Sequence, residues 1–490
     1  MTGVIALQSG IPKALTKESI NPAIQLQLKE QDFSPTMLNQ LCFYSFLVIG
    51  GFTLKDKALK TFGKTHYVSE LVPSMKGKSV TLTGWVHRKR EHGGVIFIIV
   101  RDPTGVVQVA GHRGQMADAV FDVMQQVTVE SSIVLTGTIA IDKRAPTGIE
   151  LKVTEFQIIN LADSEWPLEK DAGEAFLYDK RHLYLRSPSQ TSIMQIKAGI
   201  SRAAHQFFDG EGFTEIFPPV MVGASVEGGA TLFPFKYFGS TAYLSQSAQL
   251  YEEAAICGLE KVYLLSPSFR AEKHRTRRHL TEYWHLESEI LFGTHDDIMG
   301  VEERLVHAMV SYVKAHYQDQ LKILDIKVRV PKLPFKRITY DEAVEIAGQQ
   351  GFTVRWGEDL GTEAERAVSK QFKDPFFIMG YPTAARSFYH MPDPSRPDVT
   401  LSSDLIAPEG YGELTSGGQR IHDLDLLLER IKNEKLDPSA YDWYLELRKF
   451  GLPPHSGFGM GLERFLVWLL RLKHIREACL FPRTPSRIHP

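Results

Sequence analysis

The sequence predicts an α+β protein in which a small five-stranded β-barrel precedes a larger domain built on an antiparallel sheet flanked by helices. The 490 residues are too many for one ordinary core, and 43% hydrophobic with 23% charged residues is the composition of a folded protein. Residues 79–160 contain short β-rich runs separated by turn residues. Beyond residue 191, helix and strand patterns mix without regular alternation, which favours an antiparallel sheet over a doubly wound one.

Four segments can be distinguished along the chain. Residues 1–65 show no clear period, and we assign them no function; a start codon placed too far upstream is one explanation. Residues 66–163 hold five β-runs in about 80 residues, the OB-fold pattern, with an SH3-like or other small β domain as the alternative. Residues 164–190 form a polar hinge, and residues 191–490 form the main domain.

Within the main domain, the predicted elements differ in their hydrophobic period. Helical spacing marks residues 191–213, 296–324 and 423–436. Strand patterns mark four further stretches, residues 261–272, 375–382, 399–408 and 411–421.

Charge and cysteine usage limit the function classes. A net charge of −2 and a pI near 6.8 argue against a protein that coats nucleic acid, so any such contact must be local. Cys42, Cys257 and Cys479 lie far apart without a CxxC pair, which indicates neither a disulfide framework nor a zinc site and favours the reducing cytoplasm. The apolar run at residues 41–54 is shorter than the ~20 residues of a membrane span, so we expect no membrane role.

The stretch FRAEKHRTRRHLTEYWHLESE, residues 269–289, is unusually charged. Between Arg270 and His279 it holds five Arg or Lys and two His residues, and carboxylates follow. Both flanks have strand patterns, so we predict a hairpin with a charged loop. A solvated loop, a nucleic-acid patch and a pocket for a small polyanion would each explain this charge.

Period two divides the second strand of this hairpin into two faces. One face carries Thr281, Tyr283, His285, Glu287 and Glu289, and the other carries Leu280, Trp284, Leu286 and Ile290 together with Glu282 and Ser288. Arg270 and Glu272 share a face of the first strand. These residue types together suit a nucleotide. The guanidinium can bind a phosphate with two hydrogen bonds, the ring can stack on a base, and the carboxylate can accept from an exocyclic amine.

Two glycine-rich segments lie downstream. Residues 455–472 contain a Gly-x-Gly-x-Gly run whose spacing is not that of a dinucleotide fingerprint, although it lets a ligand approach the backbone. The apolar helix that follows would bury Arg464, which then needs an anionic partner, either a ligand or a structural salt bridge. In residues 410–420, Glu413 and Ser416 offer hard oxygen ligands for Mg²⁺ beside a polyphosphate.

These motifs resemble those of the class II aminoacyl-tRNA synthetases. Residues 269–289 resemble motif 2, residues 457–465 resemble motif 3, and GFTEIFPPVM at residues 212–221 resembles motif 1, the dimer-interface motif. With its OB domain the chain is similar, over residues 67–490, to the subgroup that charges aspartate, asparagine and lysine. Residues 225–272 look like the asparaginyl enzymes of archaeal type.

The resemblance implies a class II catalytic domain that binds ATP in a bent form. Arg270 would hold the α-phosphate, Glu272 would read the adenine, and Tyr283 would stack under the base. Arg464 would bind the γ-phosphate, so Arg270 and Arg464 are the expected catalytic residues. The remaining ATP-binding positions implied by the resemblance are Arg278, His279 and Glu413.

Further roles are also implied by the resemblance. Mg²⁺ would be bound by Glu413 and Ser416. The amino acid would be seated by Glu227, Ser247, Gln249, Glu287 and Arg420. The central anticodon base would be contacted by Phe97 and Gln108, although Phe97 could instead be a barrel-core residue. A homodimer would form through the region around Pro218 and Pro219.

The implied activity is asparagine–tRNA ligation: asparagine and ATP give asparaginyl-AMP and pyrophosphate, and asparagine then passes to tRNA(Asn). Aspartyl relatives carry a Lys at the position of Glu252, where asparaginyl relatives usually have a neutral residue. Glu287 could accept from the substrate amide, and Arg420 could donate to its oxygen. Because residues 415–427 look more like the aspartyl version, an aspartate–tRNA ligase, including a non-discriminating one, remains the alternative. An amidating paralogue would lack the barrel, and a non-catalytic RNA-binding relative would lose Arg270 or Arg464.

Overall fold

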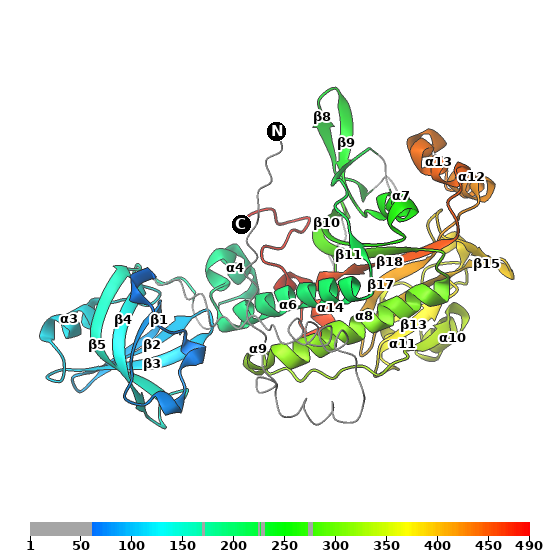
Figure 1. The fold of residues 1–490 in the computed structure, drawn as a ribbon. Helices are drawn as coiled ribbons and strands as arrows, with labels where there is room; N and C mark the ends of the chain where they lie inside the picture. The colour runs from blue at the N-terminus through cyan, green and yellow to red at the C-terminus, as the bar shows by residue number, and fades with distance from the viewer. Residues whose placement is uncertain (1–60, 169–171, 224–225, 227–230, 273–277) are drawn as a thin grey trace, which may run out of the picture. The chain divides into compact units, whose positions relative to one another are not determined.

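The computed structural model describes residues 61–168, 172–223, 226, 231–272 and 278–490. These residues fall into two compact units, one ending at Glu165 and the other beginning at Trp166, whose elements are labelled in Figure 1. The apolar run at residues 41–54 and most of the predicted N-terminal extension lie outside the described residues. In the part of the chain that is described, no helix is both long and apolar enough to cross a membrane.

The first unit is the predicted closed five-stranded barrel, with strand order β1-β2-β3-β5-β4. Its elements are β1 (Ser79–His92), β2 (Val95–Asp102), β3 (Gly105–His112), α3 (Asp118–Gln126), β4 (Ser132–Ile141) and β5 (Ile149–Asn160). The period-two pattern places Ile96, Ile98 and Val100 in the barrel core. The helix α3, which we did not predict, buries Phe121 and Met124 in the same core.

The chain joins the barrel slightly before the predicted boundary at residue 66. The Nζ atom of Lys64 lies 3.8 Å from Oδ2 of Asp102 on β2. The backbone N–H of Thr65 donates to the carbonyl oxygen of Thr81 on β1 over 2.9 Å. Residues 64 and 65 are therefore part of the barrel unit.

The second unit is organised around an eight-stranded sheet of order β12-β13-β16-β17-β18-β11-β10-β6. Its strands are β6 (Thr214–Glu215), β10 (Lys261–Phe269), β11 (Glu282–Leu291), β12 (Lys336–Thr339), β13 (Phe376–Met379), β16 (Ser402–Ala407), β17 (Gly412–Gln419) and β18 (His455–Gly461). Only the two outer pairs, β12 with β13 and β6 with β10, are parallel. The prediction of an antiparallel sheet is therefore confirmed for its centre.

Two smaller sheets and a set of helices complete this unit. The small sheets contain β7 (Met221–Val222), β8 (Pro234–Tyr237) and β9 (Ser240–Leu244), and β14 (Pro392–Asp393) with β15 (Arg396–Thr400). The helices are α4 (Glu174–Asp179), α5 (Arg181–Tyr184), α6 (Pro188–Gly210), α7 (Gln249–Leu259), α8 (His295–His316), α9 (Gln318–Ile323), α10 (Tyr340–Gln349), α11 (Thr362–Ser369), α12 (Leu424–Asn433), α13 (Asp442–Lys449) and α14 (Leu462–Leu469). Residues 296–324, expected as one helix, divide into α8 and α9 at Tyr317.

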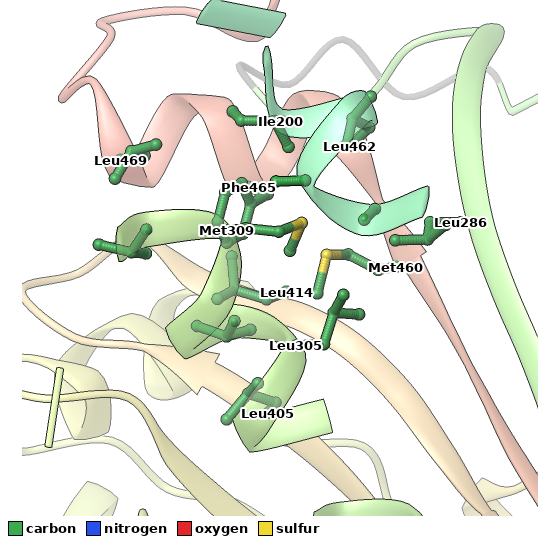
Figure 2. Close-up of a cluster of buried hydrophobic side chains, with 14 of the residues drawn as sticks. Ile200, Leu286, Leu305, Met309, Leu405, Leu414, Met460, Leu462, Phe465 and Leu469 are labelled. Atoms are coloured by element: carbon green, nitrogen blue, oxygen red, sulfur yellow. The ribbon is translucent and has the colours of Figure 1, made fainter. Parts of the chain in front are cut away.

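The main core lies between one face of the large sheet and the helices α6, α8 and α14, which run across it in Figure 1. Figure 2 shows how Leu286, Leu414 and Met460 from three adjacent strands meet Met309 of α8 and Phe465 of α14. Each of these side chains is at most 2% exposed. Because neighbouring residues of a strand point to opposite faces, this packing leaves the alternate residues of β11, β17 and β18 free to form a site on the other face.

The segment expected as a hinge, residues 164–190, contains α4, α5 and the start of α6. Arg181 in α5 is fully buried. Its Nε atom donates to the carbonyl oxygen of Leu480 over 3.0 Å, and its NH2 atom donates to that of Cys479. This part of the segment is therefore tied to the C-terminal region of the second unit.

Candidate active site

The charged hairpin forms as predicted, and its two faces have opposite environments. β10 and β11 pair in antiparallel register with Leu265 opposite Leu286. Leu286 faces the core, whereas Tyr283, His285 and Glu287 line a pocket on the other side of the sheet. Most of the charged loop, residues 273–277, lies outside the described residues.

This pocket has a cavity volume of about 130 Å³ and collects residues from distant parts of the chain. The predicted site residues that line it are Ser247, Gln249, Arg270, Glu272, Arg278, His279, Tyr283, Glu287, Glu413, Ser416, Arg420 and Arg464. Glu227 lies outside the described residues, and Phe97 and Gln108 lie in the barrel unit. The pocket also contains Glu252, His285, Tyr389 and His390, which were not assigned roles from the sequence.

At one end of the pocket, an arginine, a carboxylate and a histidine lie next to one another, and the arginine also contacts an aromatic ring. The guanidinium carbon of Arg270 lies 5.7 Å from the centre of the Tyr283 ring. Arg270 NH1 is 4.0 Å from Oε1 of Glu272, and Nε2 of His279 is 3.7 Å from Oε2 of the same carboxylate. Each of these four side chains is accessible from the pocket, so the arrangement offers a phosphate fork, a stacking surface and a hydrogen-bond acceptor to one ligand.

Arg464 and Arg278 each have a carboxylate partner at the same end. Arg464 NH1 lies 2.8 Å from Oε1 of Glu413, and Arg278 NH1 lies 3.0 Å from Oε1 of Glu365. Burial would raise the pKa of Glu413, but Arg464, Arg278 and Arg270 outweigh it and lower that pKa, so Glu413 is ionised. Burial raises the pKa of Glu365 to about 7, against the opposing effect of Arg278. Glu365 comes from α11, and no sequence motif indicated it.

At the other end of the pocket, Glu287 is held by donors from the segment before α7. Its Oε1 atom accepts from the hydroxyl of Ser247, and its Oε2 atom accepts from the backbone N–H of Ala248 over 3.1 Å. Glu287 is only 2% exposed. Burial raises its pKa, although the hydrogen bonds from Ser247 and Ala248 act in the opposite direction. The predicted residues Ser247 and Glu287 are thus direct partners.

Arg420 also reaches this end and is paired from behind. Its Nε donates to Oε1 of Glu289 over 2.7 Å, and both side chains are at most 4% exposed. Its guanidinium carbon lies 5.4 Å from the centre of the Tyr389 ring. Glu289 raises the pKa of Arg420 even though burial alone would lower it, so Arg420 keeps its charge.

Gln249 is oriented by a buried network that the sequence did not reveal. Its Nε2 atom donates to Oε1 of Glu253 over 3.0 Å. The other oxygen of Glu253 accepts from Arg448, from the hydroxyl of Tyr444 at 2.8 Å, and contacts Nε2 of His455 at 3.0 Å. Arg448 and His455 lower the pKa of Glu253 despite its complete burial. Because its amide nitrogen is used in this way, Gln249 presents its carbonyl oxygen as an acceptor.

The glycines of β18 make room for side chains of the neighbouring strand. Glu289 is opposite Gly457, and a Cβ at Gly457 would lie 2.1 Å from the Glu289 carboxyl carbon. A Cβ at Gly459 would lie 2.4 Å from Nε2 of His285. Gly457 and Gly459 therefore let β11 side chains lie across β18. Gly459 and Gly461 also line the pocket, so the expectation that this run admits a ligand to the backbone stays a prediction.

The proposed metal positions lie on two adjacent strands. Ser416 on β17 is opposite Asp404 on β16, and Arg386 donates to the Ser416 hydroxyl over 3.1 Å. Oδ2 of Asp404 pairs with Arg386 at 2.7 Å, whereas Oδ1 is buried without a hydrogen-bond partner among the described residues. Glu413 and Ser416 line the cationic end of the pocket, and Asp404 is the cross-strand neighbour of Ser416, so hard oxygen ligands adjoin this end. No motif around Asp404 in the sequence indicated this position.

On the barrel, Phe97 points away from the core. It is partly exposed, whereas Ile96 and Ile98 on either side are fully buried. The guanidinium carbon of Arg90 lies 4.8 Å from the centre of the Phe97 ring. Gln108 is on the adjacent strand, where its Nε2 donates to Glu150 over 2.7 Å. The alternative that Phe97 is a core residue is therefore wrong, while its contact with an anticodon base stays a prediction.

Two family models match the chain. The model of the class II tRNA synthetases (D, K and N) matches residues 173–485, and the model of the OB-fold nucleic acid binding domain matches residues 80–159. The asparagine–tRNA ligase of Thermococcus kodakarensis is 50% identical over 432 residues, which are 86% of this chain and 99% of that protein.

Solved structures agree with these matches. The crystal structure of asparaginyl-tRNA synthetase from Pyrococcus horikoshii complexed with asparaginyl-adenylate aligns with a TM-score of 0.84 at 46% identity, over 87% of this chain and 100% of that chain. The aspartyl tRNA synthetase from Entamoeba histolytica aligns with a TM-score of 0.78 at 27% identity, over 89% and 95% of the two chains. The chain therefore belongs to the class II tRNA synthetases of the D, K and N group and, within that group, to the asparagine–tRNA ligase family.

Proposed function

We propose that this protein activates asparagine with ATP and transfers it to the 3′ end of tRNA(Asn). The observation that carries the proposal is the single pocket with two unlike ends. One end presents Arg270, Arg278 and Arg464, which suit a polyphosphate. The other presents Ser247, Gln249, Glu287 and Arg420, which suit a small polar amino acid. A reaction that joins an amino acid to a nucleotide needs both in one cavity.

In the first step, the carboxylate of asparagine attacks the α-phosphorus of ATP. The bond from that phosphorus to the oxygen shared with the β-phosphate breaks, giving asparaginyl-AMP and pyrophosphate. Arg270 would neutralise charge on the α-phosphate, and Arg464 would bind the γ-phosphate. Glu272 and Tyr283 would fix the adenine by hydrogen bonding and stacking. No protein base is required, because the attacking carboxylate is already ionised; positioning and charge supply the rate.

Mg²⁺ fits the oxygen ligands at the cationic end. Glu413 and Ser416 would hold it, and the buried Oδ1 of Asp404 gives a further hard donor next to Ser416. Among the described residues, no three acidic, His or Cys side chains form a ready-made metal cage. This suits an ion that shares its coordination with substrate phosphates and water. When bound, Mg²⁺ would neutralise phosphate charge in the same place as Arg464.

Different residues would recognise the α-ammonium group and the side chain of asparagine. The carbonyl oxygen of Gln249, left over after its amide nitrogen binds Glu253, can accept from the α-ammonium group. Glu227 is proposed for the same group from its resemblance alone. Arg420 can donate to the side-chain oxygen of asparagine, and Glu287 can accept from the side-chain NH₂.

In the second step, a ribose hydroxyl at the 3′ end of tRNA attacks the carbonyl carbon of asparaginyl-AMP, and AMP leaves. We propose that the barrel binds the anticodon, with Phe97 stacking on a base and Gln108 reading it. The partly exposed Phe97 ring beside Arg90 supports this assignment.

We also propose that the enzyme is a homodimer joined at the region around Pro218 and Pro219. The adjacent Phe217 is 85% exposed and Met221 is 56% exposed, which suits an interface in the assembled protein. Sedimentation of the wild type and of Phe217→Asp would test it, since the variant should shift toward the monomer. Cytoplasmic localisation remains a prediction, in keeping with the free thiols of Cys257 and Cys479.

The function is tested by pyrophosphate exchange and by tRNA charging with asparagine and with aspartate. We expect asparagine to be preferred by about 10⁴ or more, because a site that pairs an NH₂ group rejects the analogue without it. Faster use of aspartate by the wild type would overturn the proposal. In Glu287→Gln the discrimination should fall, and unchanged discrimination would remove Glu287 from this role.

A further inference from the structure

Glu252 lies at the amino-acid end of the pocket, although the reaction described above does not use it. It follows Gln249 by three residues in α7, so the two side chains lie on the same side of the helix. Its side chain lines the pocket together with Arg420 and Glu287. It is only 1% exposed, and its Oε1 atom has no hydrogen-bond partner among the described residues.

The other carboxylates around Glu252 each have specific hydrogen-bond or ion-pair partners. Glu289 on β11 pairs with Arg420, and Glu287 on the same strand accepts from Ser247 and Ala248. Glu253, the next residue in α7, pairs with Arg448 and His455. Among the described residues, Arg420 is the cation that acts on Glu252, and Arg420 already pairs with Glu289.

An ionised carboxylate in this position would be a buried charge without a counterion, which costs several kcal/mol. The neutral carboxylic acid avoids that cost. The same conclusion follows from its environment, because burial raises the pKa of Glu252 well above its usual value, and Glu287 and Glu289 raise it further while Arg420 opposes them.

We infer that Glu252, as a neutral carboxylic acid, binds the side-chain carboxamide of the substrate and is a specificity-determining residue. The inference rests on the proposed function, since it requires that asparagine occupies this end of the pocket. A carboxylic acid has one O–H donor and one C=O acceptor, and a carboxamide has the matching C=O acceptor and NH₂ donor. The two groups can therefore form a pair of hydrogen bonds, which leaves the second N–H of the amide for Glu287 and the second lone pair of its oxygen for Arg420.

Aspartate cannot satisfy this arrangement. Its carboxylate offers acceptors only, so the C=O of Glu252 would lose its partner and would face a negative charge, as would Glu287. Discrimination would then come from a neutral partner that matches the amide and leaves the acid without a hydrogen-bond donor at this position.

Two substitutions of Glu252 separate the neutral acid from alternatives. Glu252→Gln keeps a neutral donor and acceptor, and Glu252→Leu removes both at similar volume. The matched control is Glu260→Gln, an exposed residue just beyond the end of the same helix. For each protein we would measure pyrophosphate exchange with asparagine and with aspartate, and the thermal unfolding midpoint.

At neutral pH we expect Glu252→Gln to keep the KM for asparagine within about threefold, and Glu252→Leu to raise it by about tenfold or more, because a buried amide loses its partner. Ionisation of Glu252 would remove its O–H donor. The kcat/KM of the wild type for asparagine should therefore fall as the pH is raised, which gives an alkaline limb in its pH profile. This alkaline limb should be absent from Glu252→Gln and present in Glu260→Gln.

A folded Glu252→Leu variant with normal KM for asparagine would overturn the inference, as would a Glu252→Gln variant as impaired as Glu252→Leu. If Glu252→Leu does not fold, the pH profile of kcat/KM tests the inference instead. An alkaline limb that is the same in Glu252→Gln as in the wild type would overturn it. If the inference about Glu252 fails but the wild type still catalyses asparagine-dependent pyrophosphate exchange, the proposed function stands. If the wild type exchanges pyrophosphate with aspartate and not with asparagine, both the inference and the proposed function are overturned.

Discussion

The guanidinium of Arg464 lies 2.8 Å from the carboxylate of Glu413, which ties the first turn of α14 to β17 at the cationic end of the pocket. Both residues are proposed to act on the same polyphosphate, Arg464 directly and Glu413 through Mg²⁺. When ATP and Mg²⁺ bind, phosphate oxygens would therefore replace the Glu413 carboxylate as the partner of Arg464. The pair keeps the arginine in place before the substrate arrives.

Removal of Arg464 or of Arg270 should abolish most of the activity. We expect Arg464→Ala and Arg270→Ala each to reduce asparagine-dependent pyrophosphate exchange by about 100-fold or more, because each meets charge that develops in the transition state. Arg471→Ala is the control, since Arg471 is a 59% exposed residue shortly after the same helix. Near wild-type exchange by a folded Arg464→Ala or Arg270→Ala variant would contradict the ATP site.

The Glu253 network should matter for stability as well as for binding. Glu253→Leu leaves Arg448 without a counterion at a fully buried position, so we expect a loss of about 3–5 kcal/mol in the free energy of unfolding. The double variant Glu253→Leu with Arg448→Met should recover much of that loss but not the asparagine KM, because Gln249 is still unanchored. Urea unfolding and exchange kinetics measure the two effects. Full recovery of the KM in the double variant would remove Glu253 from the positioning of Gln249.

Glu302 provides a prediction about pH. It is fully buried in α8, it accepts from the hydroxyl of Thr415, and burial raises its pKa to about 8. Because the folded state holds this proton more tightly than the unfolded state, stability should fall as pH rises through the range from the ordinary carboxyl pKa to about 8. Glu302→Gln mimics the protonated acid, so it should gain stability relative to the wild type as pH increases.

Chemical unfolding of both proteins at several pH values tests this difference, with the exposed Glu345→Gln as control. A difference between wild type and Glu302→Gln that stays constant with pH would show that Glu302 is ionised in the folded protein.

Phe97 and Ile98 are neighbours with opposite environments, which makes them a matched pair. Phe97→Ala should raise the tRNA KM by roughly 5- to 150-fold, the equivalent of ~1–3 kcal/mol of stacking, without changing pyrophosphate exchange. Ile98→Ala should instead lower the melting temperature of the barrel, since Ile98 is fully buried. An unchanged tRNA KM in Phe97→Ala would exclude the ring from the anticodon contact.

Deletion of residues 1–60 should leave aminoacylation unchanged. The relative from Thermococcus kodakarensis is matched over 99% of its length by 432 residues, so its fold has little that corresponds to this segment. Deletion of residues 1–64 should weaken the barrel, because it also removes Lys64 from Asp102. Loss of charging, solubility or dimerisation in the shorter deletion would show that the segment contributes to the enzyme.

Local periodicity was enough to predict the barrel strands and the β10–β11 hairpin. In β11, alternation alone separated Leu286 from Glu287, and the structure places these on opposite faces of the sheet. The helix α3 was missed because it occupies a short segment between two strands, where a loop is equally expected.

The partners of the site residues were not predictable in the same way. Glu365 meets Arg278 across 87 positions of the sequence, and Arg448 meets Glu253 across 195. Each is one charged residue in an ordinary amphipathic helix, with no motif around it. The glycines of β18 were noticed, but their function depends on which strand lies beside them. That strand is β11, and its pairing with β18 is set by the tertiary fold and not by the local sequence.

The long reach of these contacts has a consequence for synthesis on the ribosome. The barrel is complete at Asn160, so it can fold while the rest of the chain is still being made. The catalytic pocket cannot, because Gln249 is held through Glu253 by Arg448 and His455, and Arg464 itself comes 211 residues after Glu253. A nascent chain would therefore display a finished RNA-binding module long before it could consume ATP, and prematurely terminated products would bind tRNA without charging it.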